Sequence, residues 1–354
     1  MRTVFIEKQI SGILTVFPKD EYSFEDSLKD DAIKRARRLK RIMGFDKRRR
    51  VKTDTNSSDL YCRGIDYLLE KGLIKPEEIG AVITVTLTQD YLTPSISSII
   101  HDYLDLSKDV ICADIPQACT GYVVGLIEAF SLLEYLEDKK VLLCTGDVLN
   151  RIRQNEEKRD EPSFGGDAAS ISIIENNSNF GKIYCNYYSD GENYRDLIMP
   201  VGGFAHPVYS EEDAMISEDG ETKNGLHIIM DGSNVFNFIQ REVPPMIDDL
   251  FGYSGYDRDD IDLFLFHQPN RFILEKLAEK MQVPKEKMYM DIVEKYGNSN
   301  ASTIPAVITD SVPKEMLEEK RLCCLAGFGA GLSWASLIME LGEMTFCEEI
   351  EVDL

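Results

Sequence analysis

The chain has 354 residues, and its 39 Lys and Arg stand against 62 Asp and Glu, so the formal net charge is −23 at pH 7. Such an acidic surface repels phosphate backbones and anionic lipids, which excludes nucleic acids and membrane surfaces as expected partners. The 43% hydrophobic content is ordinary for a folded chain, and the length favours two packed units over one.

Residues 1–17 contain neither an uninterrupted apolar stretch nor a small-residue cleavage site, so nothing in them indicates a signal peptide. No window approaches 18 consecutive apolar residues, and we expect a cytoplasmic protein. Eight cysteines, several inside apolar runs, fit buried reduced thiols better than a disulfide framework. The sequence has no CxxC or HExxH pattern, so we expect no metal site.

Segment 32–52 departs from the overall acidity. It carries eleven Lys and Arg but a single Asp, a net charge of +10, so the rest of the chain carries −33. A charge run of this kind usually forms a solvated helix face. That is the interpretation the segment supports by itself.

The rest of the chain alternates between strand-like and helical patterns. Short apolar, β-branched runs predict strands at Ala81–Leu87, Val110–Ile115, Lys140–Thr145, Ala169–Ile174, Leu226–Met230, Ile261–His267, Arg321–Ala326 and Ser333–Glu340. A 3.6-residue period predicts helices at Ser58–Lys71, Gly121–Glu137, Asn234–Leu250 and Arg271–Met281. This alternation favours an α/β protein with a largely parallel, buried sheet.

Two pairs of segments suggest an internal repeat. Residues 77–85 resemble residues 259–267 at an offset of 182, and residues 139–144 resemble residues 319–324 at an offset of 180. Two matches at almost one offset indicate a duplicated α/β unit, although any two buried strands look alike. The polar, Gly- and acid-rich stretch 181–224 would then connect the two units, with surface loops or a lid.

Cys119 is the first candidate for chemistry. It lies between the predicted strand Val110–Ile115 and an apolar helix that starts near Gly121. The positive end of a helix dipole stabilises a thiolate, so a cysteine at this place is expected to be nucleophilic. The alternative is an inert buried cysteine, which is the better interpretation for the other seven.

His267 ends a predicted buried strand and is followed by Gln268, Pro269 and Asn270. Active sites of α/β proteins gather their groups at the carboxyl ends of sheet strands, which makes His267 a candidate. A structural histidine with its hydrogen bonds satisfied is an equally good interpretation of this residue alone.

Asn298 lies in the segment YGNSNAS, a loop that leads into a helix. Adding the repeat offset of 180 to Cys119 gives position 299, next to this asparagine. The duplication would therefore place Cys119 and Asn298 at equivalent helix starts. The simpler interpretation is a turn followed by a helix N-cap.

The glycine-rich segment GFGAG at residues 327–331 is not a dinucleotide fingerprint, because Leu332 stands where a third glycine belongs and strand-like sequence follows. A backbone bend with exposed N–H groups is the better interpretation. Together with the N–H of Cys119, such donors could form an oxyanion hole for a thioester carbonyl.

The ordered set of ADIPQACTGYVVGL, HQPN, YGNSNAS and GFGAGLSWAS resembles β-ketoacyl-acyl-carrier-protein synthase III of the thiolase superfamily. Weaker matches in TLTQDYLTPS, GGDAAS and IMDGSNVFNF extend the resemblance over nearly the whole chain. It implies a five-layered αβαβα fold made of two duplicated halves, usually a homodimer. We expect an N-terminal half at 1–180, connecting loops or a lid at 181–224, and a C-terminal half at 225–354.

The resemblance also implies a ping-pong Claisen condensation without a cofactor, in which thioesters of coenzyme A and phosphopantetheine are the substrates. Cys119 would accept the acyl primer from acyl-coenzyme A. His267 and Asn298 would then stabilise the enolate formed from malonyl-acyl-carrier protein as CO₂ leaves. The backbone N–H groups of Cys119 and Ala330 would hold the tetrahedral oxyanion.

Several positions depart from the family pattern. Ala330 replaces a usual glycine, which requires a negative φ there, and Pro269 and Arg271 alter the segment after His267. Thr93 stands where relatives often have a bulky residue at the end of the primer pocket, so we expect room for a long or branched primer.

The substrates implied by the resemblance are anionic, as is a typical carrier protein, so the basic segment becomes the expected landing site. The residues expected to bind substrate or carrier are Arg41, Arg48, Arg49, Arg50, Asn270 and Arg271. An acyltransferase that passes the acyl group to an alcohol or amine stays open as an alternative. A non-catalytic subunit is disfavoured by the intact Cys119, and a biosynthetic thiolase by Gly327, which stands where a second reactive cysteine would be needed.

Overall fold

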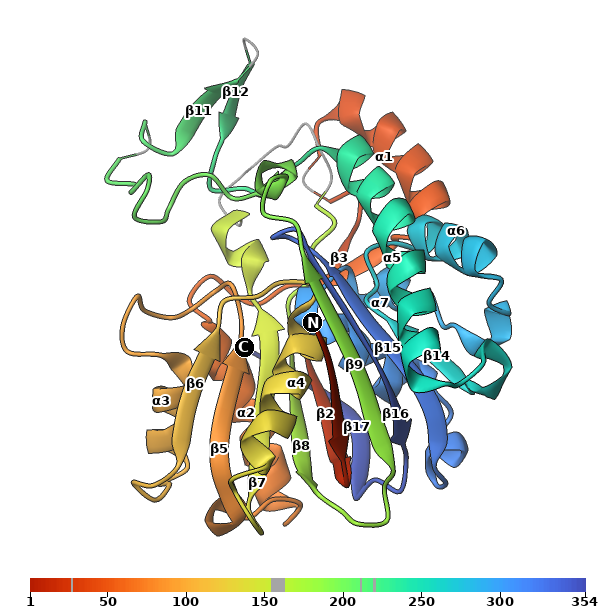
Figure 1. Ribbon diagram of the computed structural model, residues 1–354. Coiled ribbons are helices and arrows are strands. Elements are labelled where there is room, and N and C mark those ends of the chain that lie inside the picture. The colour runs from red at the N-terminus through yellow and green to blue at the C-terminus, as the bar shows by residue number, and fades with distance from the viewer. Residues whose placement is uncertain (27, 154–162, 211, 219–220) are drawn as a thin grey trace.

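The computed structural model describes residues 1–354 apart from 27, 154–162, 211 and 219–220. Two β-sheets lie face to face with helices between them and on both outer sides (Figure 1). In sheet order, the six-stranded sheet contains β17 (Phe346–Val352), β2 (Lys8–Pro18), β8 (Ala168–Asn176), β7 (Lys140–Asp147), β5 (Ile79–Val85) and β6 (Ile111–Ile115). The five-stranded sheet contains β1 (Arg2–Ile6), β9 (Lys182–Ser189), β16 (Ser333–Leu341), β15 (Arg321–Gly329) and β14 (Leu263–Phe266).

The helices are α1 (Asp30–Met43), α2 (Ser57–Glu70), α3 (Ile96–Tyr103), α4 (Gly121–Leu133), α5 (Gly232–Ser254), α6 (Arg271–Met281), α7 (Ile292–Tyr296) and α8 (Thr303–Ala306). Short two-stranded ribbons pair β3 (Glu21–Ser23) with β4 (Lys47–Arg49), β10 (Leu197–Ile198) with β13 (Ile229–Met230), and β11 (Met215–Glu218) with β12 (Glu221–Asn224). The β11–β12 hairpin projects from the body of the molecule at the upper left of Figure 1. Within the described residues, no helix combines the length and apolar character needed to cross a bilayer.

Three hydrophobic clusters correspond to the interfaces between the layers. The central cluster joins α4, through Leu126 and Phe130, to Leu143 of one sheet and Leu325 of the other. A second cluster packs α5 and α6 on the outer face of the five-stranded sheet, and a third packs α2 and α3 on the outer face of the six-stranded sheet. Burial on both sides explains why α4 is apolar around most of its circumference. The layers confirm the expected αβαβα fold.

The topology confirms the internal repeat. β5 runs parallel to β7, and β7, β8 and β2 then follow in antiparallel pairs. β14 runs parallel to β15, and β15, β16 and β9 follow with the same relative directions. The two segment pairs that matched in sequence are therefore β5 with β14 and β7 with β15. The two halves repeat one arrangement of four strands.

Some expectations from sequence were incomplete. Residues 182–189, expected in the connecting loops, form β9 inside the five-stranded sheet, and of Leu226–Met230 only Ile229–Met230 is a strand. The basic segment forms α1 and β4. All eight cysteines are free thiols, of which four are buried and four, Cys119 among them, are partly exposed.

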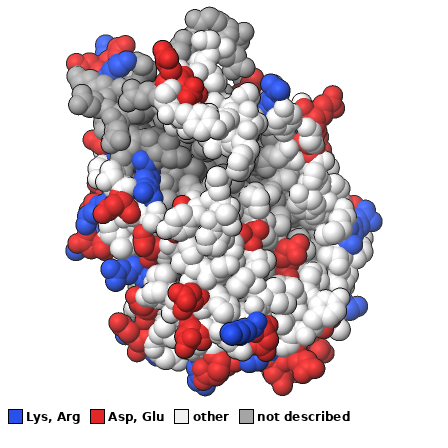
Figure 2. Space-filling model, turned by 90° about the vertical axis from the view of Figure 1, so that its left-hand side faces the viewer, with Lys and Arg blue, Asp and Glu red and all other residues white. Residues whose placement is uncertain are grey.

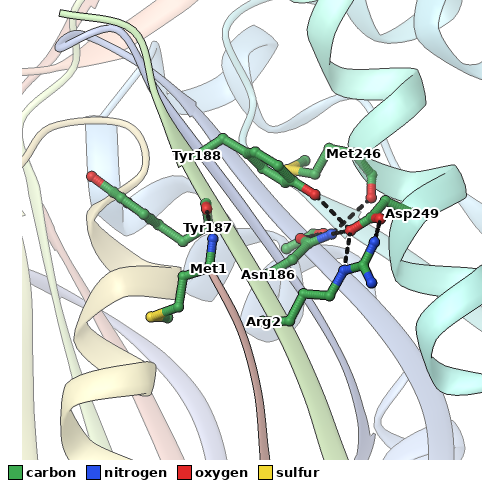
Figure 3. A network of polar contacts seen from close by, with 8 residues as sticks. Met1, Arg2, Asn186, Tyr187, Tyr188, Met246 and Asp249 are labelled. Carbon is green, nitrogen blue, oxygen red and sulfur yellow. Dashed lines mark hydrogen bonds and ion pairs between the residues drawn. The ribbon is translucent and has the colours of Figure 1, made fainter.

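Strand β1 is held to β9 and α5 by a polar network (Figure 3). The terminal ammonium of Met1 donates to the carbonyl oxygen of Tyr187 at 2.8 Å. The guanidinium of Arg2 pairs with the carboxylate of Asp249 on α5, and Tyr188 of β9 donates to the same carboxylate at 2.5 Å. Arg2 holds the pKa of Asp249 below its usual value. The Arg2–Asp249 ion pair joins β1 to α5 and takes no part in the candidate active site.

Candidate active site

Cys119 lies in the turn that leads from β6 into α4, two residues before Gly121, the first residue of the helix. A Cβ on Gly121 would lie 2.5 Å from Cγ1 of Val85, so the start of the helix needs a glycine to pack against β5. This close approach fixes the thiol between the two sheets. The structure therefore places Cys119 at the start of a buried helix, as expected.

The glycine-rich end of β15 packs directly on the cysteine turn. A Cβ on Gly329 would lie 2.7 Å from Cβ of Cys119, and one on Gly327 would lie 2.8 Å from Cα of Thr120. Glycine is required at Gly327 because the backbone of Thr120 approaches closely, and at Gly329 because the side chain of Cys119 does. Ala330 follows at once and is not among the non-glycine residues with positive φ, so its departure from the family pattern causes no backbone strain.

His267 is buried directly after β14, with 1% of its surface exposed. Its Nδ1 lies 2.7 Å from the hydroxyl oxygen of Thr303, and this hydroxyl donates its hydrogen to the carbonyl oxygen of Asn300 at 2.8 Å. Since the hydroxyl has one hydrogen, Nδ1 of His267 is the donor toward Thr303, and Nε2 of the neutral ring carries a lone pair. Burial lowers the pKa of His267 to about 3, so the ring is neutral.

The loop between α7 and α8 carries two asparagines. Asn298 is held by its backbone, which donates to Phe164 at 2.9 Å and accepts from Gly166 at 3.0 Å, and its side-chain oxygen accepts the N–H of Asn300 at 3.0 Å. The residue that reaches the thiol is Asn300, whose Oδ1 lies 3.7 Å from Sγ of Cys119. Sequence reasoning missed Asn300. The repeat offset pointed to this turn but did not separate its two asparagines.

Asp147, at the end of β7, holds the side chain of Asn300 by a hydrogen bond. Its Oδ1 accepts from the N–H of Leu87 at 2.7 Å and from the hydroxyl of Thr86 at 2.9 Å. Its Oδ2 accepts the side-chain N–H of Asn300 at 2.7 Å. Burial raises the pKa of Asp147 above its ordinary value. This carboxyl group belongs to the site, and sequence reasoning missed it.

The electrostatics differ from the expectation for Cys119. Burial, and next the nearby Asp147, raise the pKa of the thiol to about 12. Desolvation of the charged form thus opposes the stabilisation of thiolate that we expected from the helix dipole. The resting sulfur is a thiol, and it needs a base to become a nucleophile. The unprotonated Nε2 of His267 is a group of that kind within the same network.

The structure corrects the expectation for three of the basic residues. Arg48 is 2% exposed, and its Nη1 donates to Asn150 at 3.3 Å. Arg49 donates to Glu351 at 2.6 Å, and Arg50 is buried with its guanidinium 4.5 Å from the ring centre of Tyr22. Side chains engaged inside the fold in this way do not form a surface landing site.

Asn270 and Arg271 begin α6, four residues after His267. Asn270 is 7% exposed and caps the helix, with its Oδ1 accepting the N–H of Ile273 at 2.9 Å, which is a structural role. Arg271 is partly exposed and donates to Glu294 at 3.3 Å. It lines a shallow depression of about 430 Å³ together with Arg41 and Lys40 at the end of α1.

Thr93 is exposed in the segment that joins β5 to α3, beside Tyr91 and Leu92, which are 59% and 78% exposed. The end of an acyl pocket has to be covered, so Thr93 does not close one within its own chain. Among the described residues, no group of three or more His, Cys, Asp or Glu could hold a metal ion.

Known proteins match this chain over most of its length. Residues 113–191 match the family model 3-oxoacyl-[acyl-carrier-protein] synthase III, and residues 252–341 match the model of its C-terminal part. A putative 3-oxoacyl-[acyl-carrier-protein] synthase 3 of Campylobacter jejuni is 30% identical over 351 residues, which cover 97% of both chains. Beta-ketoacyl-[acyl-carrier-protein] synthase III of Streptococcus uberis is 31% identical over 83% of this chain and 88% of its own.

Solved structures agree with this. The crystal structure of a 3-oxoacyl-(acyl-carrier protein) synthase of Burkholderia xenovorans superposes with a TM-score of 0.88 over 99% of both chains, at 28% identity. The layered fold, the cysteine at the start of the central helix and the similarity over the full length thus point the same way. The chain belongs to the 3-oxoacyl-[acyl-carrier-protein] synthase III family.

Proposed function

We propose that the protein condenses an acyl primer, supplied by acyl-coenzyme A, with malonyl-acyl-carrier protein to give a β-ketoacyl-carrier protein. Membership of the family makes it an enzyme of the transferase class. The observation that carries the proposal is one network, in which Cys119 of the first half contacts Asn300 of the second, and Asn300 is linked through Thr303 to His267. The free thiols and coenzyme A substrates support a cytoplasmic location.

In the acylation step, the sulfur of Cys119 attacks the thioester carbonyl of the primer, and its proton passes to Nε2 of His267. The tetrahedral oxyanion would lie at the N–H groups of Cys119 and Ala330, where one donor typically contributes about 3 kcal/mol. The C–S bond to coenzyme A then breaks, and the departing thiolate takes the proton from His267. The products are acyl-Cys119 and free coenzyme A.

In the condensation step, the malonyl carboxylate leaves as CO₂, and its bonding electrons form an enolate on the thioester. Because Nε2 of the resting His267 lacks a proton, the ring must take one up before it can donate to the enolate oxygen, beside the amide of Asn298. The α-carbon attacks the acyl carbonyl and expels the thiolate of Cys119, which recovers the proton from His267. One proton is consumed for each CO₂ released.

We expect acyl-coenzyme A to add the mass of its acyl group to the protein, and malonyl-carrier protein then to remove it with release of CO₂. Intact-mass measurement over a panel of primer lengths and branches tests this, with Cys119→Ala as the control that stays unmodified. A preference for primers longer or more branched than acetyl would support the assignment of Thr93. An adduct that persists without CO₂ release would instead favour the acyltransferase alternative.

Replacement His267→Ala should reduce acylation at pH 7 by about 10²- to 10³-fold, because the thiol then has no adjacent base. The raised pKa of Cys119, about 12, means that the thiolate fraction grows about tenfold for each pH unit up to that value. Quenched-flow mass measurement from pH 7 to 9 should therefore show acylation by the variant rising steeply, while condensation is not restored. Acylation at the wild-type rate and independent of pH would contradict the role of His267 as a base.

For the carrier protein, we propose a landing surface on α1 rather than on the arginines that follow it. Lys34, Arg38 and Arg41 are exposed along this helix. The end of α1 meets α6, since a Cβ on Gly44 would lie 2.9 Å from Cβ of Arg271. The surface thus adjoins the helix that follows His267. An acidic carrier protein would be attracted to it although the rest of the chain repels it.

Reversing Lys34, Arg38 and Arg41 to Glu together should raise the KM for malonyl-carrier protein about tenfold and leave kcat nearly unchanged, because the lost contacts are exposed charge pairs. The salt dependence of the reaction should weaken as well. The matched control reverses three exposed lysines elsewhere, Lys71, Lys108 and Lys182, which alters the net charge equally. An equal rise of KM in both variants would show that net charge, not α1, attracts the carrier.

We also propose a homodimer formed through the free edge of β6. This strand ends the six-stranded sheet and pairs with β5 on one side. Large apolar side chains are exposed on it and near it, among them Leu87, Tyr91, Leu92, Tyr103 and Ile111. Figure 2 shows this side of the molecule with few charged side chains at its centre and most of them around its margin. A second copy would cover these groups and Thr93, and it would pair the strand edge.

Light scattering should therefore report a mass of twice 40.2 kDa. Replacement Ile111→Lys places like charges near each other across a two-fold axis and should lower the mass toward that of one chain. Ile6→Lys is the matched control, because Ile6 is also half-exposed and lies on β1, the edge of the other sheet. Dissociation by Ile6→Lys and not by Ile111→Lys would place the interface elsewhere.

A further inference from the structure

Asn300 contacts four residues of the site, namely Asn298, Thr303, Asp147 and Cys119. Its backbone N–H donates to the side chain of Asn298 at 3.0 Å, and its carbonyl accepts from Thr303, the partner of His267. Its side chain lies between the carboxylate of Asp147 and the sulfur of Cys119. The residue is 7% exposed, so these contacts are shielded from water.

The orientation of the Asn300 amide follows from its neighbour. Asp147 offers acceptor oxygens only, so the end of Asn300 that lies 2.7 Å from it must be the NH₂ group. The other end, Oδ1, then faces Sγ of Cys119 at 3.7 Å. An amide oxygen can only accept a hydrogen bond, and hence the Cys119 thiol must be the donor. The arrangement suits a protonated sulfur and repels a thiolate.

The backbone supports this placement. Asn300 has φ of +51°, a left-handed conformation that asparagine adopts more readily than most residues. The carboxylate of Asp147 is itself held in place. Its Oδ1 accepts hydrogen bonds from Leu87, Thr86 and Thr88, and its Oδ2 accepts one from the side chain of Asn300. Neither side chain of the pair is free to rotate without breaking a buried hydrogen bond.

We propose that Asn300 is a further catalytic residue, which the Asp147 carboxylate orients so that its amide oxygen holds the Cys119 thiol as a hydrogen-bond donor. The pair keeps the sulfur protonated and aligned until the substrate arrives and His267 takes the proton. It also disfavours reaction of Cys119 with other electrophiles in the resting enzyme, since the thiolate is the reactive form. This inference rests on the proposed function for its place in catalysis, but the contact itself does not.

The S–H stretching band of Cys119 in the infrared tests the contact directly, because a thiol that donates a hydrogen bond absorbs at lower wavenumber. The difference spectrum between the whole wild-type protein and Cys119→Ser isolates this band from the other seven thiols. We expect the band at low wavenumber in the wild type and a shift upward in Asn300→Gly. Glycine is chosen because it removes the amide and accepts the positive φ without strain.

Asp147→Asn is the second variant. It removes the buried charge and lets Asn300 turn its NH₂ group toward the sulfur, without changing the space around Cys119. Alkylation of Cys119 by iodoacetamide at pH 7.5, followed by peptide mapping, should become about tenfold faster, as expected for a thiol pKa one unit lower. Gln117→Ala is the control for both measurements, because Gln117 lies two residues from Cys119 and its side chain donates to Ser333 at 2.7 Å.

An S–H band that Asn300→Gly leaves in place, or that Gln117→Ala shifts equally, would overturn the proposal. So would alkylation of folded Asp147→Asn at the wild-type rate. Should Asp147→Asn fail to fold, the infrared result for Asn300→Gly decides alone. Neither measurement uses acyl-coenzyme A or carrier protein, so a failure of the condensation assay would leave this result independent.

Discussion

The burial of α4 between the two sheets is the constraint on which the active site depends. The helix contacts both sheets, and the turn directly before it carries Cys119. Glycines at 121, 327 and 329 leave room for Val85, Thr120 and Cys119 to pack closely against them, where a Cβ would collide. The same burial that positions the sulfur removes water from it, which is why its pKa rises and why the site needs a base.

The duplicated topology brings the remaining groups to the same depth. β5 and β14 are equivalent strands. Loops within the second half carry His267 and the 298–300 turn, and this turn contacts Cys119. Each half by itself would hold only part of the machinery. Chemistry in this fold therefore requires that the central layer is complete, and the buried bonds around Asp147 and Thr303 lock that layer together.

Much of this was predictable from the sequence, for identifiable reasons. Short apolar runs bounded by polar residues are a signal for buried strands, so β5, β7 and β15 were found. The choice between Asn298 and Asn300 was not predictable from the sequence. It depends on the positive φ of Asn300 and on the carboxylate of Asp147, 153 residues away along the chain. Arg49 was misjudged for a similar reason. Its partner Glu351 lies 302 residues further along the chain, and no local sequence pattern indicates such an ion pair.

The first and the last strand of the chain each pair with the sheet of the other half. β1, at the N-terminus, completes the five-stranded sheet of the second half, while β17, at the C-terminus, pairs with β2 of the first. Strand β2 is buried along its whole length, yet its outer edge is paired only when the last residues of the chain are in place. During synthesis, the first sheet therefore cannot be completed until β17 has left the ribosome. Completion of the first half thus depends on residues that are synthesised after most of the second half, and folding does not proceed domain by domain.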